Sequence, residues 1–186
     1  MKSYLVLVLI FLPFSVFASP SPLSIDWQNR HKHVPSVKHY KHFFGSVKSG
    51  SVYYTTDSLI FDVENELHLH FHKGRIHKAI IVAGTNGITE QNCFKKHSNF
   101  VDMLTKKYGK ADKISVTKDL DHDDLFYVNK CSLVRNGLYI QTTSWSTKKH
   151  HINLNFFGEF GEYYIEVEYI NKQLSTDLDA AHMERF

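Results

Sequence analysis

Two stretches of the chain alternate strictly between apolar and polar residues. In Glu66–His72, Leu67, Leu69 and Phe71 fall on one side and histidines fall on the other. In Tyr163–Ile170, two tyrosines, an isoleucine and a valine alternate mainly with polar residues. A period of two is typical of a β-strand with one buried face and one face toward solvent. Both stretches are therefore predicted to be half-buried strands of an antiparallel sheet.

Further strands are predicted where β-branched and aromatic residues lie between turn residues. These stretches are Ser58–Val63, Arg75–Ala83, Lys113–Thr117, Leu125–Val134, Leu138–Ser146 and Ile152–Phe157. The dipeptide Asn136-Gly137 favours a tight hairpin turn, because both of its residues tolerate positive φ. It therefore predicts that Leu125–Val134 and Leu138–Ser146 pair as a hairpin.

One long helix is predicted over about Glu90–Tyr108. Its less polar positions recur at spacings of three and four and form a single stripe. These positions are Cys93, His97, Phe100, Val101, Leu104 and Tyr108. Thr89 is suited to begin the helix, and Gly109 is suited to end it.

Strands on both sides of a single helix predict an α+β fold rather than a parallel sheet with alternating helices. We expect a curved antiparallel sheet of hairpins and a C-terminal meander, with one main helix packed on it. The predicted organisation is a partly irregular segment at 19–50, one domain at 51–174 and a polar tail at 175–186. With 42% hydrophobic residues, the chain can bury a substantial core.

The N-terminus resembles a cleavable export signal. Lys2 supplies a positive charge, Leu5–Phe17 is apolar apart from Pro13 and Ser15, and small residues follow. The alternative, a membrane anchor, needs roughly 20 apolar residues, and this run is shorter. We predict that residues 1–18 are removed and that no transmembrane segment remains. The mature protein is then exported, either to the periplasm or into the medium.

Charge argues against nucleic acid as a partner. The formal net charge is +3 at pH 7 with neutral histidines, and removal of Lys2 with the signal lowers it by one. Proteins that bind nucleic acid usually carry a much stronger basic excess. We therefore expect a protein or a small ligand outside the cytoplasm as the partner.

The chain has two cysteines, Cys93 and Cys131. An even pair in an exported protein is typical of one disulfide bond. The alternative is a reactive thiol, because Cys93 and His97 lie one helical turn apart and imidazole can activate a thiol. Both residues belong to the less polar stripe, so the disulfide is the favoured interpretation.

Histidines form the most distinctive cluster. His68, His70 and His72 fall on one face of a predicted strand, and His77 follows across the Lys73-Gly74 turn. Imidazoles at i and i+2 can approach one ion, so the pattern is compatible with zinc or copper. Two alternatives are a solvated face that needs no ligand and a contact surface that gains charge in mild acid.

A basic stretch precedes the first predicted strand. Arg30, Lys32, Lys38 and Lys41 lie in a region without acidic residues from Arg30 to Lys48. This stretch is a candidate contact for an anionic surface such as a lipid headgroup, a polysaccharide or an acidic partner. The alternative is a solvated arm with no binding role.

An acidic segment contains Asp119, Asp121, Asp123 and Asp124. The first three have the spacing that starts an EF-hand calcium loop. However, Asp124 occupies the position that requires glycine, and Lys130 occupies the position that requires the bidentate glutamate. The EF-hand is therefore rejected, and an irregular calcium site is the remaining alternative to a plain loop.

Known catalytic signatures do not appear in the sequence. It lacks G-x-S-x-G, H-E-x-x-H and a glycine-rich phosphate loop. We predict a non-enzymatic binding protein that uses the solvated face of its sheet or the rim of its hairpins. The alternatives are a histidine-based metal-binding protein and a small hydrolase of unrecognised type.

Overall fold

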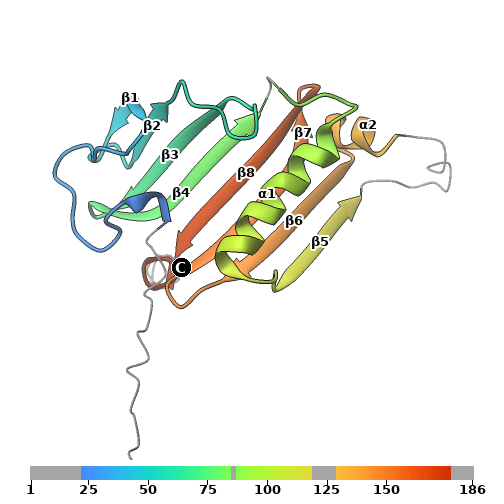
Figure 1. Ribbon diagram of the computed structural model, residues 1–186. Helices are drawn as coiled ribbons and strands as arrows, with labels where there is room; N and C mark the ends of the chain where they lie inside the picture. The colour runs from blue at the N-terminus through green and yellow to red at the C-terminus, as the bar shows by residue number, and fades with distance from the viewer. Residues whose placement is uncertain (1–21, 85–86, 119–128, 177–186) are drawn as a thin grey trace, which may run out of the picture.

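The computed structural model describes residues 22–84, 87–118 and 129–176. The predicted signal at residues 1–18, the four aspartates of the acidic segment and the tail from residue 177 onward lie outside these ranges. Figure 1 shows the described elements, which follow in this order: η1 (Pro22–Ser24), β1 (Lys41–Ser46), β2 (Ser51–Thr55), β3 (Asn65–His72), β4 (Arg75–Gly84), α1 (Cys93–Tyr108), β5 (Lys113–Lys118), α2 (Lys130–Arg135), β6 (Tyr139–Ser146), β7 (His150–Glu159) and β8 (Glu162–Asn171). Residues 172–176 then continue as helix.

The eight strands form one sheet with the order β1-β2-β3-β4-β8-β7-β6-β5. Each neighbouring pair is antiparallel. The sheet thus consists of two four-stranded meanders, which join where β4 pairs with β8 (Figure 1). The strands do not close into a barrel, since β1 and β5 are the two edges. At this level the predicted antiparallel α+β fold with one main helix is confirmed.

Alternating burial along the strands separates the two faces of the sheet. In β3 the side chains of Leu67 and Leu69 are fully buried, whereas His68 and His70 are half-buried on the opposite face. The predicted alternation in β8 is likewise confirmed, because Tyr163, Ile165, Val167 and Tyr169 are all buried. The inner strands β2–β4 and β6–β8 therefore contribute one side to the core and the other side to what we call the open face, whereas the edge strands β1 and β5 have no buried side.

Helix α1 packs on the core face through the predicted stripe. Cys93, His97, Phe100 and Leu104 are its buried residues. The His97 ring stacks on Phe156 of β7 with 4.9 Å between ring centroids. At the C-terminal end, Trp145 donates a hydrogen bond from Nε1 to the Gly109 carbonyl at 3.0 Å. These contacts place the helix over the second meander (Figure 1).

The first meander is covered on the same face by residues 22–40, which we call the strap. Ile25, Trp27 and Val37 of the strap are buried in the core. The Trp27 ring meets the His150 ring edge to face at 4.8 Å. Tyr54 of β2 also donates a hydrogen bond to the Pro35 carbonyl at 2.7 Å. The strap therefore performs for β2–β4 the covering role that α1 performs for the second meander.

Two predicted strands are wrong. Residues 58–63 form a loop with one isolated bridge between Ile60 and Val63, and Phe61 and Asp62 within it have positive φ. In the predicted strand Leu125–Val134, the described part from Lys130 onward belongs to α2. The Asn129 side chain accepts a hydrogen bond from the Cys131 amide at 2.9 Å, and this N-cap favours helix over the local β propensity.

The predicted hairpin turn at Asn136-Gly137 is instead the end of α2. Gly137 has φ 73°, and the Leu138 amide donates to the Leu133 carbonyl at 2.9 Å. This pattern is typical of a glycine-terminated helix. Gly158 of β7 lies directly below, where a Cβ atom would collide with the Val134 carbonyl oxygen. The missing side chain lets α2 approach the sheet closely.

Candidate binding face

The open face carries half-buried polar side chains. In the described part of the chain, α1 and the strap both pack on the core face. The opposite face presents two rows that cross the strands, and the pairing register defines them. One row contains Ser144, Asn153, Glu168, Ile80, His68 and Tyr53, and the next contains Thr142, Asn155, Glu166, Val82, Glu66 and Thr55. The polar members are concentrated on β6, β7 and β8.

A hydrogen-bonded chain runs along the first row. Ser144 Oγ donates to Asn153 Oδ1 at 2.9 Å, and Asn153 Nδ2 donates to Glu168 Oε2 at 3.1 Å. The other carboxylate oxygen of Glu168 lies 3.3 Å from Lys78 Nζ. The side chains of Lys78 and Glu168 are only 32% and 19% exposed, so this ion pair is partly shielded from water. The contacts fix the orientation of four side chains on four strands.

In the second row, fewer of the described polar groups are hydrogen-bonded to one another than in the first row. Thr142 Oγ1 donates to Asn155 Oδ1 at 2.9 Å. Within residues 22–84, 87–118 and 129–176, the Asn155 Nδ2 group has no acceptor, so it can donate to a ligand. Glu166 lies beside Asn155 in the register and is half-buried. Among the described residues, its carboxyl group makes no hydrogen bond or ion pair. Burial, followed by the nearby charge of Glu168, raises the pKa of Glu166. Such perturbed and unpaired groups are typical of functional sites.

An aromatic pair borders these rows. The rings of Phe157 and Tyr164 stack with 5.5 Å between centroids and 19° between planes. Tyr164 lies against Gly84 of β4, where a Cβ atom would lie 2.8 Å from Tyr164 Cδ1. Glycine at this position therefore gives the tyrosine ring room to lie over the neighbouring strand. The pair forms a rigid aromatic surface beside the polar rows.

A groove with a cavity volume of about 620 Å³ continues from the open face. Its lining includes Glu66, Val82 and Tyr164 of the open face. The remaining lining residues are Thr55, Thr56, Asp57, Leu59, Glu64, Asn65 and Gly84. Its size falls within the range of small-molecule sites in proteins. The groove thus adjoins the second polar row at Thr55, Glu66 and Val82.

The predicted histidine cluster lies on the same face, on β3. His68 contacts Glu66 at 3.1 Å, and Ser51 Oγ lies 3.2 Å from His70 Nδ1. His77 lies at the bulge in β4, and its ring centroid is 6.2 Å from that of His70. His72 lies farther along β3, opposite Arg75.

Metal binding by these histidines stays a prediction. Across residues 22–84, 87–118 and 129–176, no three His, Cys, Asp or Glu side chains gather closely enough to hold a metal ion. Burial, with a contribution from Lys78, lowers the pKa of His70 to about 4. His70 Nε2 is buried without a partner in the described structure, so no acid completes a Ser-His-acid arrangement with Ser51. The hydrolase alternative therefore gains no support from this contact.

The basic residues of the predicted interaction segment are all exposed. Arg30, Lys32 and Lys38 belong to the strap, whereas Lys41 begins β1. Lys41 Nζ lies 2.6 Å from Asp57 Oδ2, a residue that lines the groove. Lys41 is therefore partly neutralised by its neighbour, and binding of an anionic surface by this segment stays a prediction.

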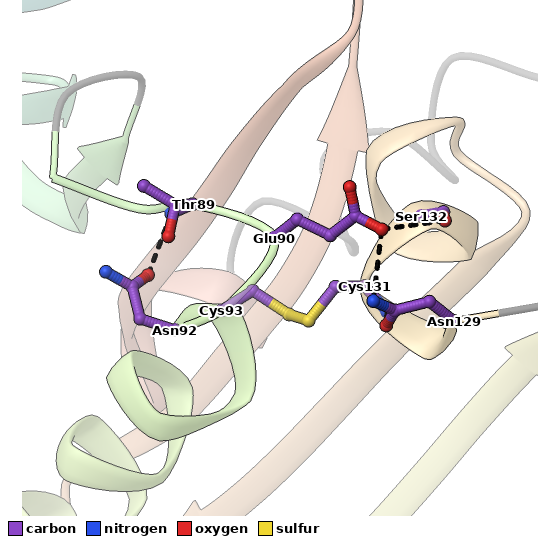
Figure 2. The surroundings of a disulfide bond; sticks show 7 residues. All are labelled: Thr89, Glu90, Asn92, Cys93, Asn129, Cys131 and Ser132. Atoms are coloured by element: carbon purple, nitrogen blue, oxygen red, sulfur yellow. Dashed lines mark hydrogen bonds between the residues drawn. A yellow bond between two sulfur atoms is a disulfide. The ribbon is translucent and has the colours of Figure 1, made fainter.

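The predicted disulfide between Cys93 and Cys131 is confirmed and lies away from the open face (Figure 2). The two Cα atoms are 6.1 Å apart, and both cysteines are buried. Glu90 Oε1 accepts hydrogen bonds from Asn129 Nδ2 at 3.0 Å and from Ser132 Oγ at 3.3 Å. These bonds form a second link between the start of α1 and α2. Cys93 therefore serves a structural role, since it has no free thiol for His97 to activate.

Sequence reasoning did not single out the polar residues of β6–β8. The alternation in Tyr163–Ile170 predicts that Glu166 and Glu168 face solvent, and the same alternation is present in Ile152–Phe157, where it could have identified Asn153 and Asn155. Their convergence depends on the register between strands, which alternation alone does not provide.

Comparison with known proteins gives no relative. No protein-family model, curated protein sequence or solved structure matches the chain. In the described ranges, no helix has the length and apolar content needed to cross a bilayer. The candidate site therefore rests on the chemistry of its own residues.

Proposed function

We propose that the protein is an exported binding protein that recognises its partner with the open face and the adjoining groove. The disulfide supports the exported setting, because such bonds form and persist mainly in oxidising compartments. The concave shape of the groove and its continuity with the polar rows support binding at this face.

The observation that carries the proposal is the fixed polar network from Ser144 through Asn153 and Glu168 to Lys78. Long exposed side chains that only keep a surface soluble lose conformational entropy if they are held in place. Here the side chains are oriented before any ligand arrives, which lowers the entropy cost of binding. Beside them, Asn155 and Glu166 retain hydrogen-bonding groups that a ligand can satisfy.

Thermal unfolding with a panel of probes tests this proposal. The probes are a neutral hexasaccharide, a hexalysine peptide, a hexaglutamate peptide and zinc chloride. At a concentration 100 times its dissociation constant, a ligand stabilises by about 2.7 kcal/mol. For a protein of this size that raises Tm by about 5 to 11 °C. At least one probe should produce such a shift in the wild type.

The double variant Asn153→Ala/Asn155→Ala should lose most of this shift, because it removes two amide groups from the open face. The matched control is Asn99→Ala, which removes an equally half-buried asparagine from α1. The control should respond as the wild type does. An equal response from the double variant, or no response of the wild type to any probe, would contradict the proposal.

A further inference from the structure

We propose that the open face binds a neutral saccharide chain, with sugar rings lying across the strands of the second meander and one ring against Tyr164. This inference rests on the proposed function and specifies the chemistry of the ligand. The inference is based on the distribution of charged groups, the free hydrogen-bonding groups and the aromatic pair on this face.

One ion pair on the open face is already internally satisfied. Glu168 is paired with Lys78, and Glu66 contacts His68. The Glu166 carboxyl group has no ion-pair partner in the described structure, but its burial disfavours the charged form. A strongly anionic ligand would therefore meet these carboxyl groups, and the lysine beside them is already paired with Glu168. The face is complementary to a ligand that is polar and carries no net charge.

The free groups match the hydroxyls of a sugar. The Asn155 amide donates while the Glu166 carboxyl group beside it accepts, so two adjacent hydroxyls can bind both at once. Each hydroxyl is itself both a donor and an acceptor. Across β7 and β8 the same combination recurs at Asn153 and Glu168, although their bonds to each other are already made. The rows therefore offer mixed donors and acceptors instead of a field of one sign.

The aromatic pair supplies the apolar contact that sugars also require. One face of a pyranose ring consists largely of C–H groups, which pack well on an aromatic ring. Tyr164 lies against Gly84 and stacks on Phe157, so it is ordered before the ligand binds. Adjacent strands are about 4.8 Å apart, so a saccharide chain that crosses them contacts a new set of side chains at each strand.

The position of the groove defines the direction in which a bound saccharide chain would run. Tyr164, Val82 and Glu66 belong both to the groove and to the open face. A saccharide chain anchored at Tyr164 can therefore extend over Asn155 and Thr142 on one side and into the groove on the other. This arrangement favours a chain of several sugar rings over a single sugar.

Isothermal calorimetry tests the inference with the mature full chain and three hexasaccharides. One is neutral, one carries carboxylates and one carries amines. The neutral form should bind most tightly. Tyr164→Ala and Asn155→Ala should each weaken its binding at least about tenfold, as expected for anchor residues. Two test variants are used because Tyr164→Ala removes a ring that stacks on Phe157, so its effect on binding is checked against a second substitution. Circular dichroism checks that each variant is folded.

Phe43→Ala is the matched aromatic control, since Phe43 lies on β1 and is 74% exposed. It should bind the neutral hexasaccharide like the wild type. Failure of the neutral hexasaccharide to bind, together with binding of a peptide or zinc that depends on Asn153 and Asn155, overturns the saccharide inference and leaves the proposed function standing. Saccharide binding that is unchanged in both test variants also overturns the inference.

Discussion

Acidification from pH 7 to pH 4 is expected to lower the free energy of unfolding by several kcal/mol. His70 on the open face contributes, since its pKa is also lowered to about 4, and two further histidines are buried on the core face, His97 on α1 and His150 on β7. Burial lowers the pKa of each to about 4, and Lys149 and Lys172 contribute at His150. The Nε2 atoms of both rings are buried without hydrogen-bond partners in the described structure, so a proton there would place an uncompensated charge in the core.

The direction of the effect follows from proton binding in the two states. In the unfolded chain a histidine has a pKa of about 6.5, so it takes up a proton before its folded counterpart does. The stability contributed by each neutral ring is therefore complete above pH 6.5 and is lost as the pH falls toward 4. Each histidine accounts for about 3 kcal/mol by this linkage. Glu166 acts in the opposite direction, because its pKa is raised in the folded protein.

Urea unfolding at pH 7 and pH 4 measures this effect. His97→Leu removes one of the three titrating histidines and should reduce the loss of stability at pH 4 by about a third. His151→Leu replaces the exposed neighbour of His150 and serves as the control. Equal pH dependence in the wild type and His97→Leu would show that the buried imidazole does not control the acid response.

Removal of the disulfide should be comparably severe. The double variant Cys93→Ala/Cys131→Ala frees a loop whose ends are 38 residues apart in sequence. The chain-entropy model predicts a loss of about 3 to 4.5 kcal/mol. For a protein of this size the expected fall in Tm is about 6 to 18 °C. The local effect should be greatest at α2, because a helix of six residues is not stable without tertiary contacts.

Thermal unfolding and amide exchange of the wild type and the double variant provide the measurement. Ser132→Ala is the control, since it removes one hydrogen bond to Glu90 and leaves the disulfide intact. It should cost about 1 kcal/mol or less. Unchanged stability in the double variant, or two alkylatable thiols in the native protein, would show that this bond does not hold α1 to α2.

The sequence predicts best those elements in which each face keeps the same surroundings, core or solvent, along the whole element. β3 and β8 alternate because one face meets the core along their full length, and the period of two follows directly. Helix α1 is similarly recognisable from its stripe and from Gly109 at its end. Local patterns suffice where the surroundings do not change along the element.

The errors occur where distant contacts decide the local structure. The segment around Cys131 has residues that favour a strand, but its disulfide to Cys93 and the Asn129 cap hold it as α2. The open face depends on distant pairing as well, because β4 meets β8 across a long stretch of chain. Glu168 therefore reaches Lys78 by a register that neither strand encodes alone.

Mapping of amide chemical shifts tests the central claim, recognition by the open face, most directly. The isotope-labelled protein is titrated with whichever probe of the panel stabilises it. The account predicts that the largest shifts fall on residues 142–144, 153–155 and 164–168, with smaller shifts on β3 and β4. Shifts concentrated on α1 at residues 93–108 or on the strap at residues 22–40 would contradict it, because both lie on the opposite side of the sheet.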